Sequence, residues 1–166
     1  EKVFDGCSGS GGFLIDAMAD MVKKIDAMRS LSNKEKDKLK DEVYGEHIYG
    51  SEKSLKNSRV TRMNLWFHGD GSSNVYCLDT LDKNFNYDKS LSVERKKEIE
   101  ELKDKILNKG LKFNVIFTNP PFSTNYEWIK PDEKEIIKEY DISYKELDKE
   151  KDKRVTSLKS NVMFIE

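Results

Sequence analysis

Short apolar runs alternate with longer amphipathic stretches along this chain. Four runs are rich in β-branched or aromatic residues, which predicts strands at residues 3–5, 47–50, 74–78 and 113–118. Between the first two runs, apolar residues recur at intervals of three and four, which predicts a helix carrying Leu14, Met18, Met21, Ile25 and Met28. Strands that alternate with helices favour an α/β fold with a parallel, doubly wound sheet.

Two more helices are expected before the third strand. Ser32 and Glu35 form a Ser-x-x-Glu capping box, which predicts that one helix begins at Ser32. Another is expected from about Ser54 to Phe67, because the turn-forming residues 68–71 end it.

Two stretches rich in Lys and Glu, residues 82–111 and 124–160, interrupt this pattern. Apolar positions are sparse in both, so we expect the first to be a solvated helix with ion pairs four residues apart. The second directly follows the strongest motif of the sequence. Both a mobile lid and an inert excursion stay open for it.

Composition limits how this protein could hold a nucleic acid. The chain has 166 residues, 36% hydrophobic and 37% charged, which is a polar but globular composition. Its 30 Lys and Arg are balanced by 31 Asp and Glu, for a net charge of −1. Binding through bulk electrostatics needs a surplus of clustered basic residues. Any DNA contact must therefore be local or be supplied by a partner.

Cysteine usage and hydropathy indicate a protein of a reducing compartment, with no membrane contact. Cys7 and Cys77 are too few for a disulfide scaffold, and no Cys/His cluster has zinc spacing. No run approaches the roughly 18 apolar residues of a membrane helix. We expect a cytoplasmic protein that uses no metal and buries its cysteines as small hydrophobic residues.

A glycine-rich loop, Asp5-Gly-Cys-Ser-Gly-Ser-Gly-Gly-Phe-Leu14, joins the first strand to the first helix. Glycines let the backbone approach a ligand closely, which indicates a nucleotide-like cofactor. No Lys follows Gly11 as a P-loop requires, and Leu14 stands where the dinucleotide fingerprint has its third glycine. A nucleophile elbow also fails, because Ser10 replaces its last glycine. A purely structural glycine turn stays open.

Acidic residues follow the first three predicted strands. Asp5 ends the first strand, and Glu52 follows the second, where a carboxylate could accept both hydroxyls of a ribose. Asp79 ends the third strand, where it could interact with an adenine amino group. Each could be a solvated strand-end carboxylate, but their joint placement favours one binding site.

The sequence Asn119-Pro120-Pro121-Phe122 follows the fourth apolar run, which is expected to be a buried strand. The prolines fix their own φ and carry no N–H, so this stretch presents acceptors with few competing donors. The Asn119 side-chain oxygen and the Pro120 carbonyl could bind the two hydrogens of a purine amino group. Phe122 offers a face on which an extruded base could stack.

These motifs resemble those of the N6-adenine DNA methyltransferases, and more narrowly the modification subunit of type I restriction–modification systems. Between the glycine loop and Asn119–Phe122, the blocks Gly50-Ser-Glu52, Met63-Asn-Leu65 with His68-Gly69, and Asp79-Thr-Leu81 follow that family's order. The resemblance covers about residues 2–82 and 112–122. Gly6 and Ser8 depart from it, because the family usually has Pro and commonly Gly there.

The resemblance implies a Rossmann-like class I methyltransferase fold that binds S-adenosylmethionine. The 166 residues would form a partial catalytic domain with the first four strands, cut at both ends. The resemblance implies a cofactor site made by Asp5, Gly9, Ser10, Gly11, Glu52 and Asp79. It implies catalysis at the flipped adenine by Asn119, Pro120, Pro121 and Phe122.

The implied partners are DNA, a specificity subunit and a restriction subunit. Two alternatives stay open: a methyltransferase acting on RNA or protein glutamine, and a non-catalytic scaffold that retains the fold. Relatives of the first kind more often have Tyr where this chain has Phe122.

Overall fold

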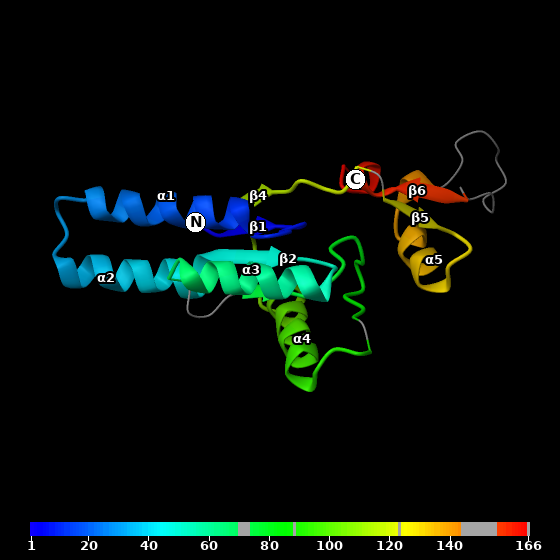
Figure 1. Ribbon diagram of the computed structural model, residues 1–166, viewed down its shortest axis with the longest axis horizontal. Helices are drawn as coiled ribbons and strands as arrows, with labels where there is room; N and C mark the ends of the chain where they lie inside the picture. Colours follow the sequence, from blue (N-terminus) through cyan, green and yellow to red (C-terminus); the bar gives the residue numbers. More distant parts are fainter. Residues whose placement is uncertain (70–73, 88, 123, 144–155, 166) are drawn as a thin grey trace. The chain divides into compact units, whose positions relative to one another are not determined.

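The computed structural model describes residues 1–69, 74–87, 89–122, 124–143 and 156–165 (Figure 1). The chain folds into two compact units. The first unit comprises residues 1–80 and 85–119, and the second comprises residues 81–84 and 120–166.

A parallel four-stranded sheet forms the centre of the first unit. Its strands are β1 (Val3–Asp5), β2 (Ile48–Ser51), β3 (Asn74–Tyr76) and β4 (Val115–Phe117). Their order is β3-β2-β1-β4, and every neighbouring pair is parallel. The predicted doubly wound sheet of four strands is therefore confirmed.

Three helices connect the first three strands, and local signals explain where two of them begin. They are α1 (Gly12–Ala27), α2 (Asn33–Glu42) and α3 (Leu55–Phe67). The predicted capping box of Ser32 and Glu35 caps α2, and the Ser54 hydroxyl caps α3 by accepting from the Asn57 N–H. A short π-helix, η1 (Val43–His47), leads into β2. Among the described residues no helix is both long and apolar enough to cross a membrane.

Side chains alternate between the two faces of the sheet, as the pleat requires. Val3, Ile48 and Val75 pack with α1 and α3 in one buried cluster, which also contains Leu14, Met18 and Leu65. Their neighbours on the strands turn to the other face, where Tyr49 and Tyr76 join a second cluster with Ile99 and Leu102 of α4 (Val93–Leu107). The first unit is therefore a three-layer α/β/α arrangement.

Residues 82–111 contain the expected helix, but this helix belongs to the strand–helix pattern and does not interrupt it. Helix α4 is the crossover between β3 and β4, and it covers one face of the sheet. One predicted ion pair four residues apart is present, between Lys97 and Glu101 at 3.8 Å, but both side chains are largely exposed. The buried residues of α4, Ile99 and Leu102, are few, which made the helix resemble a solvated one.

Strand β4 also differs from its prediction. It is shorter than the predicted run 113–118, and Ile116 and Phe117 are 64% and 39% exposed. The expectation of a buried strand before the Asn-Pro-Pro-Phe motif was therefore wrong for this chain. Among the described residues β4 pairs only with β1 and is an edge strand. Its apolar side chains are therefore partly exposed.

The second unit has its own small core. Strand β5 (Asn125–Glu127) pairs antiparallel with β6 (Ser157–Lys159), and the unit also contains α5 (Pro131–Lys138), η2 (Asp141–Ser143) and α6 (Ser160–Met163). Its buried cluster comprises Leu81, Tyr126, Ile136, Ile137, Tyr140 and Met163. The two ends of the 124–160 excursion therefore pair with each other, and residues 144–155 lie outside the described part.

Candidate functional site

The register of the parallel sheet brings the predicted site residues to one edge. Asp5 lies opposite Gly50 of β2 and Phe117 of β4, and Gly50 lies opposite Val75. The carboxyl ends of all four strands are thus level. The glycine loop, Glu52, Asp79 and Asn119 follow these ends within the first unit. Ligands of doubly wound sheets bind at this edge.

The glycine loop uses its glycines for two strained positions. Gly9 and Gly11 have φ of +53° and +91°, a region that L side chains rarely adopt. Gly11 is also the N-cap of α1, and a Cβ there would lie 3.0 Å from Cγ2 of Thr61. The path of the loop therefore strongly favours glycine at position 11.

Three side chains hold the carbonyls of the loop. The hydroxyl of Thr61 donates to Gly9 O at 2.7 Å, the Asn64 amide to Ser10 O at 2.9 Å, and the Thr80 hydroxyl to Gly6 O at 2.6 Å. No sequence pattern marked Thr61 or Thr80 as loop anchors. Asn64 and Thr80 stood in blocks that resemble the family, but without a structural role.

Asp5 is buried at the start of the loop. It is 2% exposed, and its carboxylate accepts the Cys7 N–H at 3.0 Å. Burial raises the pKa of Asp5, the Cys7 N–H opposes that shift, and the negative charge of Glu52 adds to it. Asp5 therefore shapes the turn from β1 into the loop.

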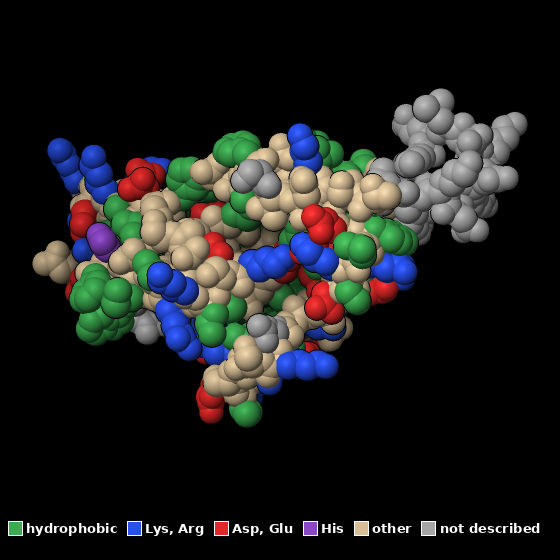
Figure 2. All heavy atoms as spheres, turned by 45° about the vertical axis from the view of Figure 1, so that its right-hand side comes forward, with side chains coloured by type: hydrophobic (Ala, Val, Ile, Leu, Met, Phe, Trp, Pro, Cys, Tyr) green, Lys and Arg blue, Asp and Glu red, His purple; other side chains and the backbone are tan. Residues whose placement is uncertain are grey.

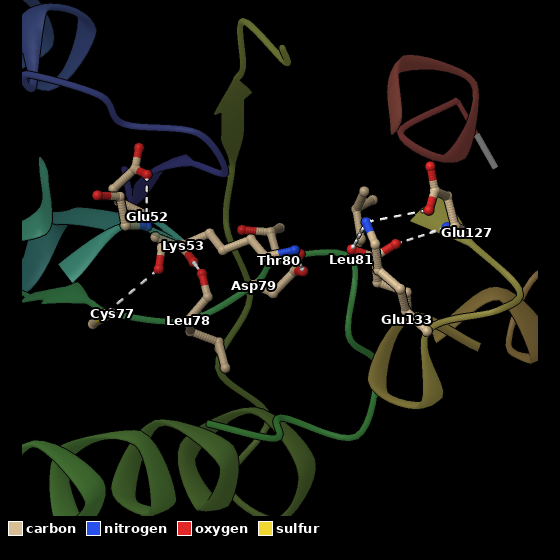
Figure 3. Close-up of polar contacts among 12 residues, drawn as sticks. Glu52, Lys53, Cys77, Leu78, Asp79, Thr80, Leu81, Glu127 and Glu133 are labelled. Atoms are coloured by element: carbon tan, nitrogen blue, oxygen red, sulfur yellow. Dashed lines mark hydrogen bonds and ion pairs between the residues drawn. The ribbon is translucent and has the colours of Figure 1, made fainter. Parts of the chain in front are cut away.

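Glu52 links the loop to the start of α3. One carboxylate oxygen accepts the Gly9 N–H at 3.0 Å, and the other accepts the Ser54 N–H at 2.9 Å. Its backbone N–H donates to Tyr76 O and its carbonyl accepts from the Leu78 N–H, so Glu52 is fixed beside the segment that follows β3 (Figure 3). A carboxylate has about four acceptor sites, so both oxygens keep capacity for ligand hydroxyls.

Asp79 lies three residues beyond the observed end of β3 at Tyr76, so the prediction that it ends the strand was wrong by that distance. The Lys53 ammonium points to the Asp79 carboxylate (Figure 3), and their closest atoms are 2.9 Å apart. The Asp79 side chain is 13% exposed and that of Lys53 is 57% exposed. Lys53, which the sequence did not single out, therefore compensates the charge of a sheltered carboxylate.

The Asn-Pro-Pro-Phe motif lies where the two units join along the chain. Asn119 is exposed and ends the first unit, whereas Pro120, Pro121 and Phe122 belong to the second. The Phe122 ring is 74% exposed. The motif therefore offers an exposed amide and an exposed aromatic face.

The cysteines and histidines have no catalytic environment in the described structure. Burial raises the pKa of the Cys7 thiol to about 11, so it is protonated at neutral pH. Cys77 is buried, as predicted, whereas Cys7 is only half-buried, so the prediction was wrong for Cys7. His68 Nδ1 lies 2.8 Å from Asn64 O, and burial lowers the pKa of His47. Within the described ranges no group of His, Cys, Asp and Glu could hold a metal ion.

Comparison with known proteins gives a fold neighbour and a family for this chain. One solved structure with a similar fold is a nuclease-deletion mutant of the Type ISP restriction-modification enzyme LlaGI in complex with a DNA substrate mimic. It is 16% identical with a TM-score of 0.50, over 74% of this chain and 10% of that enzyme's chain, so the likeness is one of fold. No curated protein matches the sequence. The profile of the family described as N-6 DNA Methylase matches residues 1–165, and the chain belongs to that family.

Proposed function

We propose that this chain carries the catalytic core of a DNA methyltransferase that modifies N6 of adenine with S-adenosylmethionine, within a restriction–modification system. The observation that carries the proposal is the level register of the sheet. It sets the glycine loop, two acidic residues and Asn119 along one edge in a chain of the N-6 DNA methylase family.

The residues at this edge fit S-adenosylmethionine. In this proposal the Gly9–Gly11 backbone passes close to the cofactor, because its two positive-φ glycines leave no Cβ in the way. Glu52 accepts the ribose hydroxyls with its remaining lone pairs, and Asp79 lies near the adenine. Asp5 keeps the loop in place. When bound, S-adenosylmethionine supplies an electrophilic methyl group on a positively charged sulfur.

Asn119 and Pro120 act on the target amino group. Its nitrogen lone pair is delocalised into the purine ring, which makes it a poor nucleophile. The Asn119 side-chain oxygen and the Pro120 carbonyl accept hydrogen bonds from its two hydrogens and localise the lone pair. S-adenosylmethionine, held by Glu52 and the Gly9–Gly11 backbone, would supply the methyl group for this lone pair and keep the carbon–sulfur bonding pair, and the proton lost from the nitrogen would pass to solvent. Pro121 keeps the turn rigid, and Phe122 stacks on the extruded base.

The charge of the chain bears on the partners that we propose for the reaction. Figure 2 shows Lys and Arg interspersed with Asp and Glu on the face in view, in keeping with a net charge of −1. Such a surface does not hold DNA through counterion release alone. We propose that a separate specificity subunit and a restriction subunit of a type I system assist this chain. The solved structure with a similar fold is that of a type ISP enzyme. A self-sufficient adenine methyltransferase is therefore the second arrangement to test.

Methylation assays decide between these functions. The full-length protein is incubated with labelled S-adenosylmethionine and duplex DNA, with and without the specificity subunit, and N6-methyladenine is quantified by mass spectrometry. We expect adenine methylation that depends on the specificity subunit. Label appearing in RNA or protein glutamine would replace the substrate proposed here. The absence of both cofactor binding and transfer would identify a scaffold.

A gel-shift titration at about physiological salt tests the partner assignment separately. We expect the protein alone to bind duplex DNA weakly and without sequence preference. Nanomolar binding of one sequence by that protein alone would favour a self-sufficient methyltransferase.

A further inference from the structure

Ser160 holds the backbone at the end of the Asn-Pro-Pro-Phe motif. Its hydroxyl donates to the Pro121 carbonyl at 2.8 Å, and its N–H donates to the Thr124 carbonyl at 3.0 Å. Ser160 is 1% exposed, so water does not compete for these bonds. One buried residue therefore fastens both the motif and the segment that leaves it.

The pairing of β5 with β6 brings Ser160 to this place, although it lies 39 residues after Pro121. Lys159 lies opposite Asn125 in the antiparallel register, so the next residue, Ser160, meets Thr124. Met163, one turn further along α6, is 1% exposed in the core of the second unit and anchors the short helix. The segment that follows the motif therefore ends beside it, and the Ser160 hydroxyl at that end binds the motif.

The direction of the Pro121 carbonyl depends on the ψ angle of Pro121, the one backbone torsion of the two prolines that neither a ring nor a following proline restricts. The pyrrolidine rings fix φ at Pro120 and Pro121. A following proline confines Asn119 and Pro120 to extended conformations, which restricts their ψ angles. The ψ angle of Pro121 has no such restraint. It turns the Pro121 carbonyl and sets the direction in which Phe122 leaves the motif.

We propose that Ser160 is a positioning residue for Phe122. By holding the Pro121 carbonyl it fixes that torsion, and so presents the ring in one orientation to the extruded base. This role rests on the proposed function of the motif. Ser160 acts through the backbone, because its hydroxyl is buried and used by Pro121, whereas the ring of Phe122 is 74% exposed.

Steady-state methylation of a cognate duplex by the full-length enzyme with its partner subunits tests this role. A duplex with 2-aminopurine at the target position reports base extrusion by fluorescence. We expect Ser160→Ala to lower both kcat and the extrusion signal by roughly two- to tenfold, the value of one buried hydrogen bond. The affinity for S-adenosylmethionine should not change. Ser160→Thr keeps the hydroxyl and should restore both values. Ser157→Ala, the same change at an exposed position of β6, is the matched control.

A double-mutant cycle with Phe122→Ala separates positioning from general stability. If Ser160 acts through Phe122, adding Ser160→Ala to Phe122→Ala lowers kcat no further. Independent, multiplying losses would overturn the proposal. If Ser160→Ala does not fold, Ser160→Cys keeps a similar shape with a weak donor, and unchanged kcat and extrusion in that variant would also overturn it. A wild-type enzyme that leaves adenine unmodified would instead overturn the proposed function itself.

Discussion

The Gly9 N–H donates to a carboxylate oxygen of Glu52 at 3.0 Å, although the two residues are 43 positions apart. This bond joins the glycine loop after β1 to the carboxylate after β2. The second oxygen of Glu52 accepts the Ser54 N–H at the start of α3. One side chain therefore connects three segments of the candidate cofactor site.

Replacing Glu52 should weaken cofactor binding by more than the loss of one contact. Glu52→Ala removes the acceptor for the ribose hydroxyls and the bond that holds Gly9. Hydrogen bonds to charged groups contribute about 1.5–3 kcal/mol, so we expect at least a tenfold increase in the Kd for S-adenosylmethionine. Calorimetry on the full-length protein measures this. Glu101→Ala, which removes an exposed carboxylate of α4, should leave the Kd unchanged. Equal affinities of Glu52→Ala and wild type would remove Glu52 from the site.

The two adjacent glycines at the start of α1 should respond differently to alanine. Gly11→Ala places a Cβ at a φ of +91° and 3.0 Å from Thr61 Cγ2, so we expect a loss of about 1–2 kcal/mol in the free energy of unfolding. A Cβ on Gly12 meets nothing within 4 Å, so Gly12→Ala should keep or slightly raise stability.

Urea unfolding of both variants checks this difference. Thr61→Ser in the Gly11→Ala background removes Cγ2 and should recover part of the loss, while the strained φ keeps the rest. Equal stability of the two alanine variants would contradict the described path of the loop.

Asp5→Asn should change how the stability of the protein depends on pH. Because burial raises the pKa of Asp5 above 3.8, the folded state binds that proton more tightly than the unfolded state does. Wild-type stability therefore falls relative to Asp5→Asn as pH rises from 3.8 through the raised pKa, and it stays lower at neutral pH. We expect Asp5→Asn to be more stable at about pH 7 in urea unfolding, with the difference lost below about pH 3.5. A stability difference between Asp5→Asn and wild type that grows as the pH falls would contradict a raised pKa of Asp5.

Asn119→Ala should abolish chemistry while sparing the cofactor. Removing one well-placed transition-state hydrogen bond lowers rates by about 10²–10³. We therefore expect that loss in adenine methylation, with the Kd for S-adenosylmethionine nearly unchanged, because Asn119 contacts the target base in the proposed site. Single-turnover transfer and calorimetry on the same preparation provide both values. Wild-type turnover by Asn119→Ala would refute the mechanism.

Strand and helix order could be predicted because each depends on local pattern. The runs around Val3, Ile48 and Val75 alternate in the face they present, and the capping box at Ser32 is a short-range signal. Helix α4 was expected, but as a solvated helix, because Ile99 and Leu102 are its only buried residues. The helix is part of the core because it packs on a sheet face formed by residues from other parts of the sequence, which the pattern of the helix alone does not reveal.

Residues of the candidate site could be predicted only where they belong to a recognisable sequence motif. The acidic residues and glycines stood at strand ends, and the sheet register then aligned them. The anchors Thr61 and Thr80 were missed because their hydroxyls act on loop carbonyls far away in sequence, and a Thr has no pattern that marks this use. Ser160 was missed for the same reason, since its position depends on the pairing of β5 with β6.

The anchoring of the glycine loop has a thermodynamic consequence for ligand capture. Bonds from Thr61, Asn64 and Thr80 already fix three loop carbonyls, and Glu52 fixes an N–H. A loop that is ordered in advance loses little conformational entropy when a molecule settles on it. Each rotamer-rich side chain that binding must immobilise costs about 0.5–1.5 kcal/mol of affinity, and ordering a loop adds to this cost. Folding of the sheet and α3 has already met that cost, so a ligand at this edge retains more of its contact energy as affinity.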